Sequence, residues 1–176
     1  MPQPKLFIIT GISGSGKTTV ARQLVEHGEV AFDSKLNHGL FHFVDEYGQQ
    51  PATNHPNDPS WKQHHKWVIN QTVFSQLLEE HTQSERVFLC GGGDSLKVLW
   101  PQTKKIFLLK IDVQTLLERL NNPSRDNAFA KNTATQEALL RRLEKYQQTM
   151  IESGATVIDA RRPLDRVVDE IMELAQ

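Results

Sequence analysis

The chain has 176 residues, enough for one compact hydrophobic core and too few for two full domains. Its 20 lysines and arginines nearly balance 21 aspartates and glutamates, and the net charge of -1 excludes a broad cationic surface for nucleic acids or acidic membranes. The single cysteine, Cys90, cannot form an internal disulfide, and residues 1–5 are too short and polar for a secretory leader. We therefore expect one cytoplasmic domain over residues 1–176, monomeric or homodimeric, that binds a small molecule, no nucleic acid and no membrane.

In the first half of the chain, short apolar runs alternate with helical patterns. The run at 5–10 predicts a strand buried on both faces, and Val20, Ala21 and Leu24 have helical spacing. Three prolines between 48 and 59 exclude regular structure there. The elements predicted in this half are a strand at 5–10, a helix at 18–27, a strand at 29–32, a helix at 34–47, a loop at 48–59 and one long helix at 61–80.

The second half continues the alternation. Asp112 has the residue type of a helix N-cap, and Pro163 suits a first helical turn. Strands that alternate with helices predict a mainly parallel sheet covered on both faces, with ligands at the carboxyl ends of the strands. The elements predicted here are strands at 86–90, 105–111 and 156–159, and helices at 113–120, from Thr133 or Thr135 to Gly154, and after Pro163.

One motif carries a specific chemistry. The segment GISGSGKT at 11–18 matches G-x-x-x-x-G-K-[ST] and lies between the first predicted strand and the first predicted helix. Its glycines allow backbone N–H groups to converge on a polyphosphate, Lys17 would reach the β and γ phosphates, and the Thr18 hydroxyl would bind Mg²⁺. An incidental glycine turn is the alternative. The expected nucleotide contacts are Gly11, Ser13, Gly14, Ser15, Gly16, Lys17, Thr18 and Thr19.

On this motif, the chain resembles the small P-loop phosphotransferases, the superfamily of adenylate, shikimate, gluconate and nucleoside kinases. The length of the chain and the order of its predicted elements agree with the resemblance over nearly the whole chain. The resemblance implies a three-layer α/β/α fold with a five-stranded parallel sheet. It also implies a substrate-binding region at 34–81, a lid at 119–132, and ATP and Mg²⁺ as cofactors. Each implication has to be tested on the residues of this chain.

Asp33 closes the second predicted strand, where shikimate-type kinases place carboxylates that orient magnesium-bound water and the acceptor hydroxyl. A carboxylate there can take the proton of the hydroxyl, so Asp33 is a candidate catalytic base and metal-site residue together with Thr18. The alternative is an aspartate that caps the following helix. The chain has one acid in Phe32-Asp33-Ser34-Lys35, which departs from the paired acids of shikimate kinase.

Three glycines follow the third predicted strand and would let a substrate approach the backbone. Asp94 after them would bind metal or substrate hydroxyls, or would cap a helix. Cys90 before them is interpreted as a small packing residue. Trp61 is a candidate for stacking on the substrate. The candidate substrate contacts are Asp33, Gly91, Gly92, Gly93, Asp94 and Trp61.

Cations lie in the segment that resembles a kinase lid. Arg119 or Arg125 would spread charge over the transferred phosphoryl group, and Lys131 is a weaker candidate; the alternative is a solvated loop. The turn from the last strand to the last helix resembles the adenine-contacting loop of the same kinases, although helix initiation alone explains its proline. In this turn the expected nucleotide contacts are Ala160, Arg161 and Pro163.

The acceptor is inferred from a missing residue type. No arginine lies between Arg22 and Arg86, the segment expected to bind an anionic acceptor. We therefore predict an ATP- and Mg²⁺-dependent small-molecule kinase with a nucleoside-like acceptor. A nucleoside monophosphate kinase and a shikimate- or gluconate-type kinase are the alternatives within the class, and a partner-dependent ATPase switch is the alternative outside it. A stacking surface could come from Trp61, Trp67, Phe41, Phe43 and Tyr47.

Overall fold

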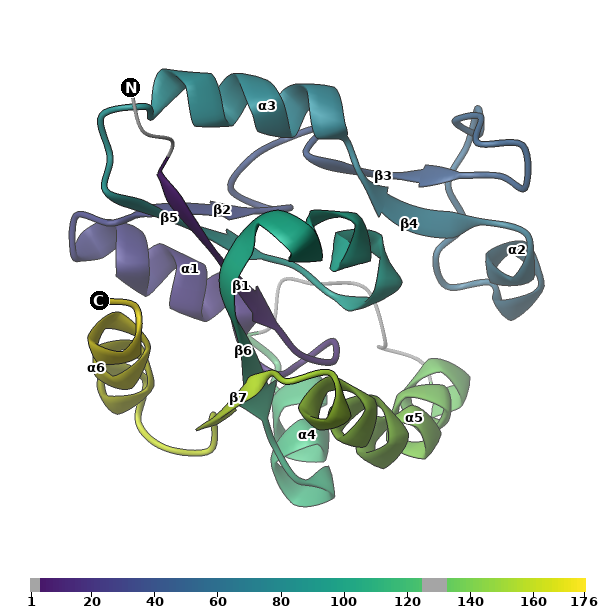
Figure 1. The fold of residues 1–176 in the computed structure, drawn as a ribbon. Coiled ribbons are helices and arrows are strands. Elements are labelled where there is room, and N and C mark those ends of the chain that lie inside the picture. The colour runs from purple at the N-terminus through teal and green to yellow at the C-terminus, as the bar shows by residue number, and fades with distance from the viewer. Residues whose placement is uncertain (1–3, 125–132) are drawn as a thin grey trace.

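A computed structural model describes residues 4–124 and 133–176. Its centre is a five-stranded sheet in the order β2-β5-β1-β6-β7, and every neighbouring pair is parallel (Figure 1). The predicted α/β fold with a five-stranded parallel sheet is therefore confirmed. The strands are β1 (Lys5–Thr10), β2 (Val30–Asp33), β5 (Arg86–Cys90), β6 (Thr103–Lys110) and β7 (Thr156–Asp159).

Helices cover both faces because the central strand is apolar on both. Phe7 and Ile9 of β1 belong to one core cluster, with residues of α1, α4, α5 and α6, whereas Leu6 and Ile8 belong to a second, with Phe74 of α3. No helix in the described ranges is long and apolar enough to cross a membrane. The helices are α1 (Lys17–Glu26), α3 (Gln71–Glu80), α4 (Val113–Leu120), α5 (Thr133–Glu152), α6 (Leu164–Leu174) and the 3₁₀ helix η1 (Gly93–Gln102), which was not predicted.

The helix predicted at 34–47 is wrong. Residues 34–40 form turns that include Gly39 at φ 79°, and Phe41–Val44 forms strand β3. In that strand the aromatic residues Phe41 and Phe43 alternate with His42, which is a strand period. The mixed pattern was therefore a turn followed by a short strand.

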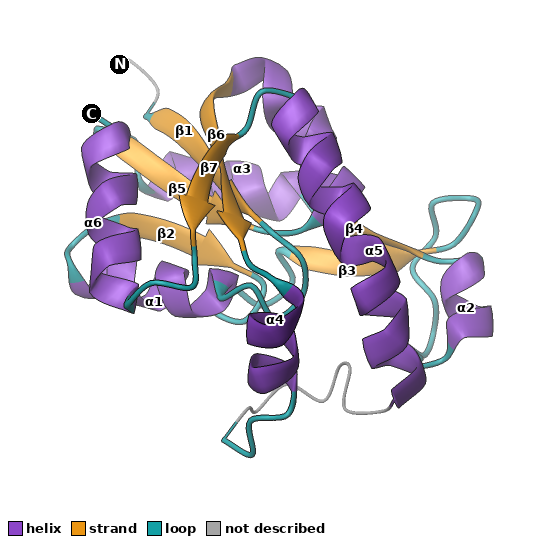
Figure 2. Ribbon diagram, turned by 90° about the horizontal axis from the view of Figure 1, so that it is seen from below, coloured by secondary structure: helices purple, strands orange, loops and turns teal. Residues whose placement is uncertain are grey.

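The long helix predicted at 61–80 is also wrong, because three elements occupy the segment: α2 (Pro59–Gln63), β4 (Lys66–Ile69) and α3. Strand β4 pairs antiparallel with β3, and the side chain of Asn70 accepts a hydrogen bond from the Val73 N–H at the start of α3. The pairing of β4 with β3 and the N-cap at Asn70 thus outweigh the helical spacing of the apolar residues in this segment. Figure 2 shows that the β3–β4 sheet and α2 project from one side of the main sheet.

A partly buried ion pair anchors the last helix. Arg86 binds Glu29 at 2.5 and 3.0 Å and also donates to the carbonyls of Met172 and Ala175 at 3.3 and 3.2 Å. The hydrogen bonds that Arg86 donates to Glu29 raise the pKa of Arg86. The guanidinium of Arg86, the first residue of β5, therefore joins the residue that precedes β2 to the carbonyls at the end of α6.

We expect Arg86→Ala to lower the free energy of unfolding by about 3 kcal/mol, because it leaves Glu29 largely buried without its partner. Urea unfolding measures this change. Lys5→Ala is the matched control, since it breaks an ion pair with Glu85 whose side chains are 44% and 81% exposed, and it should cost less than about 1 kcal/mol. Equal losses in the two variants would contradict the anchoring role.

Candidate functional site

A cavity of about 980 Å³ opens where β1, β2 and β5 end. Parallel strands bring their carboxyl ends to one edge of the sheet, and the loops that follow β1 and β5 face each other there. The cavity is lined by the whole glycine-rich loop from Gly11 to Thr19, by Asp33, and by Gly91 and Gly92. The structure thus brings together most of the residues that the sequence analysis singled out.

The glycine-rich loop needs its glycines for geometric reasons. Gly14 and Gly16 have φ of 92° and 106°, in the left-handed region that side chains disfavour. A Cβ on Gly11 would lie 2.3 Å from the Ser15 Oγ and 3.1 Å from the Leu109 carbonyl oxygen. Substitution at any of these positions would therefore disturb the loop that precedes α1.

Lys17 lies at the base of this loop. Its Nζ donates to the carbonyls of Gly11 and Ile12 at 2.8 and 3.0 Å, so the side chain folds back across the loop. Burial lowers its pKa to about 8, although the negative charge of Asp33 opposes this shift. An anion in the loop would stabilise the protonated form of Lys17.

Asp33 lies within contact of the loop, as the sequence predicted. The Thr18 hydroxyl donates to its two carboxylate oxygens at 3.1 and 3.2 Å, and the Lys35 N–H donates to Oδ1 at 2.8 Å. The Asp33 side chain is 3% exposed. Hydroxyl and carboxylate oxygens are ligands that Mg²⁺ prefers, so this pair fits a magnesium site bordered by phosphates. The Lys35 contact also shows that Asp33 caps the turn that follows β2.

The glycine run after β5 packs against both the loop and the aromatic side chains. A Cβ on Gly91 would lie 2.8 Å from Phe41, and one on Gly92 would lie 3.6 Å from the Gly11 carbonyl oxygen and 3.9 Å from the Lys17 Cε. Gly93 and Asp94 begin η1, but the Asp94 side chain lies outside the described parts. Cys90 is fully buried, and burial raises the pKa of its thiol, which suits a packing role.

Aromatic side chains of the β3–β4 sheet form the far wall of the cavity. Phe41 and Trp67 stack with centroids 5.9 Å apart and an interplanar angle of 10°, and Phe43 lies 4.6 Å from Trp67. Trp61 faces elsewhere: it stacks on His65 at 3.9 Å and is not among the cavity residues. Trp67, rather than Trp61, therefore lines the cavity.

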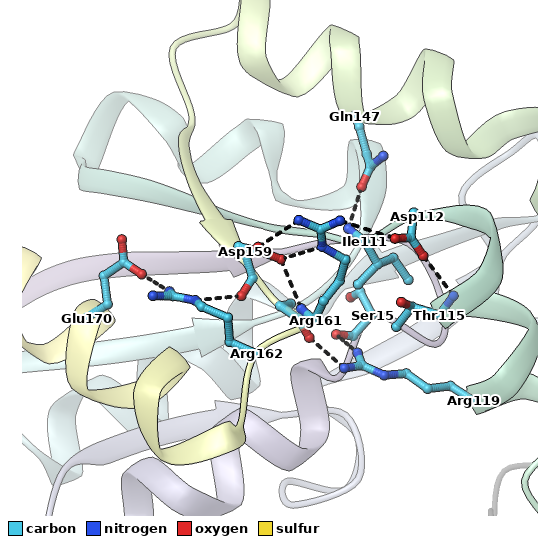
Figure 3. A network of polar contacts seen from close by, with 11 residues as sticks. Ser15, Ile111, Asp112, Thr115, Arg119, Gln147, Asp159, Arg161, Arg162 and Glu170 are labelled. Atoms are coloured by element: carbon cyan, nitrogen blue, oxygen red, sulfur yellow. Dashed lines mark hydrogen bonds and ion pairs between the residues drawn. The ribbon is translucent and has the colours of Figure 1, made fainter.

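Arg119 connects two loops of the site (Figure 3). It donates from α4 to the carbonyl of Ser15 at 2.7 Å and to the carbonyl of Ala160 at 2.5 Å. Partial burial lowers its pKa. Arg119 thus positions the glycine-rich loop relative to the turn after β7, and it lies 3.4 Å from where a Cβ on Gly16 would be.

The turn after β7 is held by its own ion pairs. Arg161 binds Asp159 at 2.8 Å and Asp112 at 3.2 Å (Figure 3). The hydrogen bonds that Arg161 donates to Asp159 lower the pKa of Asp159 to about 2. Ala160 lines the cavity, whereas Arg161 and Pro163 do not. Arg125 and Lys131 of the expected lid lie outside the described residues.

The structure adds cations that the sequence analysis missed. Lys62 of α2 and Arg142 of α5 line the cavity, together with Lys35. Burial and the charge of Arg142 lower the pKa of Lys62. No local pattern marks Lys62 or Arg142, because only the packing of α2 and α5 around the cavity brings them to the same space.

Comparisons with known proteins show which proteins this chain is similar to. Residues 8–133, more than half of the chain, match a family model described as an AAA domain. A probable thymidylate kinase from Metallosphaera sedula is 26% identical to this chain, and the match covers 97% of this chain and 92% of that protein. A guanylate kinase from Methylobacillus flagellatus is also 26% identical, with 82% and 74% covered.

Solved structures share the fold at lower identity. Shikimate kinase from Acinetobacter baumannii in complex with shikimate matches with a TM-score of 0.59 and 19% identity, over 97% of this chain and 92% of that one. Deoxyadenosine kinase from M. mycoides with bound dATP matches with a TM-score of 0.57 and 14% identity, over 97% and 98%. The chain belongs to the AAA-domain family of P-loop proteins, within the P-loop kinase superfamily of ATP-dependent phosphotransferases.

Proposed function

We propose that this protein transfers the γ-phosphoryl group of ATP to a hydroxyl group of a small, nucleoside-like acceptor. The observation that carries the proposal is the position of Asp33. Its carboxylate contacts Thr18 of the phosphate-binding loop and borders the same cavity as the aromatic wall of Phe41 and Trp67. A phosphate donor and a flat acceptor could therefore meet at one carboxylate.

The glycine-rich loop would hold ATP. Its backbone N–H groups and the N-terminus of α1 favour the triphosphate, and Lys17 would exchange its contacts with Gly11 and Ile12 for the β and γ phosphates. Arg119 and the Ala160 backbone border the cavity beside this loop. Because Arg119 already bonds two carbonyls, its first effect would be to position the loop, and a direct contact with phosphate would require a rearrangement.

The Thr18 hydroxyl and the Asp33 carboxylate would hold Mg²⁺, with Asp33 acting directly or through water. The metal would neutralise part of the negative charge of the phosphates. Before ligands bind, the Thr18 hydroxyl and the Lys35 N–H donate hydrogen bonds that orient the carboxylate of Asp33 toward the cavity.

In the proposed reaction, Asp33 would act as the general base. As the bond between the acceptor oxygen and the γ-phosphorus forms, the bond from phosphorus to the β-γ bridging oxygen breaks, and ADP leaves. The acceptor proton passes to the Asp33 carboxylate. Lys17, protonated at neutral pH because its pKa is about 8, would stabilise the negative charge on the transferred group.

The acceptor would stack on the aromatic wall. A base or similar flat ring fits beside Phe41 and Trp67, and Gly91 and Gly92 allow it to approach the backbone. An acidic acceptor is the second candidate, and Lys62 and Arg142 in the cavity favour it. The nucleoside-like and the acidic acceptor would give different phosphorylated products, so the mass of the product distinguishes them.

The direct test is to incubate the protein with Mg-ATP and a panel of nucleosides, nucleoside monophosphates, shikimate, gluconate and sugars. ADP release and product mass are measured together. A phosphorylated nucleoside is the expected result, whereas phosphorylated shikimate or gluconate would keep the kinase and reject the nucleoside-like acceptor. Slow ATP hydrolysis that no small molecule stimulates would instead identify a partner-dependent ATPase.

We expect Asp33→Asn to reduce kcat by at least about a hundredfold, since the amide cannot accept the proton and binds metal weakly. The matched control is Asp169→Asn, which makes the same change at an exposed position of α6. Initial rates with the best acceptor of the panel measure the effect. Near-normal turnover in the Asp33 variant would refute its role as base.

Trp67→Ala should raise the KM for a nucleoside at least about fivefold and leave the KM for ATP within about twofold, because it removes a stacking surface worth about 1–3 kcal/mol. Tyr47→Ala is the control: Tyr47 is 86% exposed and does not line the cavity. If both variants changed the acceptor KM equally, the aromatic wall would not be the acceptor site.

ATP affinity should depend on the protonation of Lys17. Below pH 8 the lysine is charged, so the Kd should be nearly constant. Above pH 8 binding must take up a proton, and the Kd should rise about tenfold between pH 7 and 9. Calorimetry at several pH values in buffers of different ionisation enthalpy measures both the Kd and the proton uptake. Lys17→Ala should bind weakly and lose this pH dependence, and a constant wild-type Kd would contradict the assignment.

A further inference from the structure

A second cavity, of about 350 Å³, opens between η1 and α5. Arg142 and Tyr146 line both this cavity and the active-site cavity, so the two spaces adjoin. Four of its seven lining residues are cationic, and none of the seven is a carboxylate. The lining residues are Lys97 of η1 and Arg141, Arg142, Lys145, Tyr146, Thr149 and Met150 of α5.

The cations of α5 are arranged in a way that costs helix stability. Arg141 and Lys145 are four residues apart, a spacing at which like charges on a helix repel each other. Glu137 offsets part of this charge, but it lies 3.7 Å from Arg141 and both side chains are more than half exposed. In a chain with a net charge of -1, this local excess of positive charge suits an anionic ligand.

The hydroxyl groups of the second cavity are already engaged within the protein. The Tyr146 hydroxyl lies 2.6 Å from the Thr10 Oγ1, and the Thr149 hydroxyl donates to the Lys145 carbonyl at 2.8 Å. The charged groups of the lining are all cationic: Arg141 lies 3.7 Å from Glu137, and Lys97 lies 6.0 Å from the centroid of the Trp100 ring. A phosphate is the anion that such a cluster of arginines and lysines binds well.

The positive charge continues into the active-site cavity. Arg142 and Lys62 both line that cavity, and burial together with the charge of Arg142 lowers the pKa of Lys62. At the other end of the cavity, the N–H groups of the glycine-rich loop and Lys17 would bind the triphosphate of ATP. A second anionic group would therefore belong to the other substrate.

We propose that the second cavity binds a phosphate group of the acceptor, remote from the hydroxyl that is phosphorylated. The inference rests on the proposed function and extends it: the acceptor is a phosphate ester of a nucleoside-like molecule with a free hydroxyl. Its ring lies on Phe41 and Trp67, its hydroxyl lies at Asp33, and its phosphate passes Arg142 to reach Lys97 and Lys145. The bound phosphate takes no part in bond making or breaking.

The test compares a nucleoside with its 3′-monophosphate, which retains the 5′-hydroxyl. Equilibrium dialysis without ATP measures the affinities, and product mass with Mg-ATP measures turnover. We expect the wild-type protein to bind the 3′-monophosphate at least about tenfold more tightly than the nucleoside and to phosphorylate it at the 5′-hydroxyl. In the double variant Lys97→Ala/Lys145→Ala, this preference should fall to within about twofold.

Lys97 and Lys145 are exposed, so their truncation removes charge without opening the core. Lys104→Ala, which removes an exposed charge from β6 outside both cavities, should keep the wild-type preference. Equal wild-type affinities, or a preference that survives in the double variant, would overturn the inference. So would inorganic phosphate that binds as tightly as the 3′-monophosphate, because the cavity would then be a site for free anions.

Binding and turnover together distinguish a failure of the remote phosphate site from a failure of the proposed function. If the nucleoside is phosphorylated but its 3′-monophosphate is not, or is not preferred, the kinase stands and the remote phosphate site is wrong. If the binding preference appears and is lost in the double variant, yet neither compound is phosphorylated, the anion site exists but the acceptor assignment is wrong together with the proposed function.

Discussion

The contact between Thr18 and Asp33 is the interaction on which the site depends. It joins the first turn of α1 to the end of β2, although β5 separates β2 from β1 in the sheet. Parallel pairing with β5 in register, Asp33 opposite Cys90 and Ile9 opposite Cys90, brings these strand ends to one level. The Asp33 carboxylate therefore lies beside the phosphate-binding loop rather than at a distance from it.

The region inserted between β2 and α3 determines what this carboxylate faces. Strands β3 and β4 form a separate antiparallel pair, and Phe41 of that pair packs against Gly91 of the main fold. The aromatic wall is thus attached to the catalytic edge at a position where a larger residue than glycine would clash. In the proposed function, acceptor selection and phosphate binding would be carried by two substructures that meet at this glycine.

Cations reach the cavity from elements that are remote in sequence. Arg119 of α4 spans two loops through their carbonyls, whereas Arg142 of α5 borders both cavities. In the proposed function, the first arginine would organise the nucleotide end of the cavity, and the second would lie at the acceptor end. An acceptor cannot be judged uncharged from the arginine-free segment between Arg22 and Arg86 alone, because α5 supplies the arginine that the segment lacks.

The sequence by itself determined the parallel sheet, the glycine-rich loop with Lys17 and Thr18, and the position of Asp33, because local patterns specify buried strands, tight turns and strand ends. It also located the cap at Asp112. Only the tertiary structure decided the β3–β4 pair, since Trp67 has helical spacing in sequence but stacks on Phe41 across strands. It likewise brought Lys62, Arg142 and the second cavity together. Such contacts arise from packing between distant segments, which no local spacing encodes.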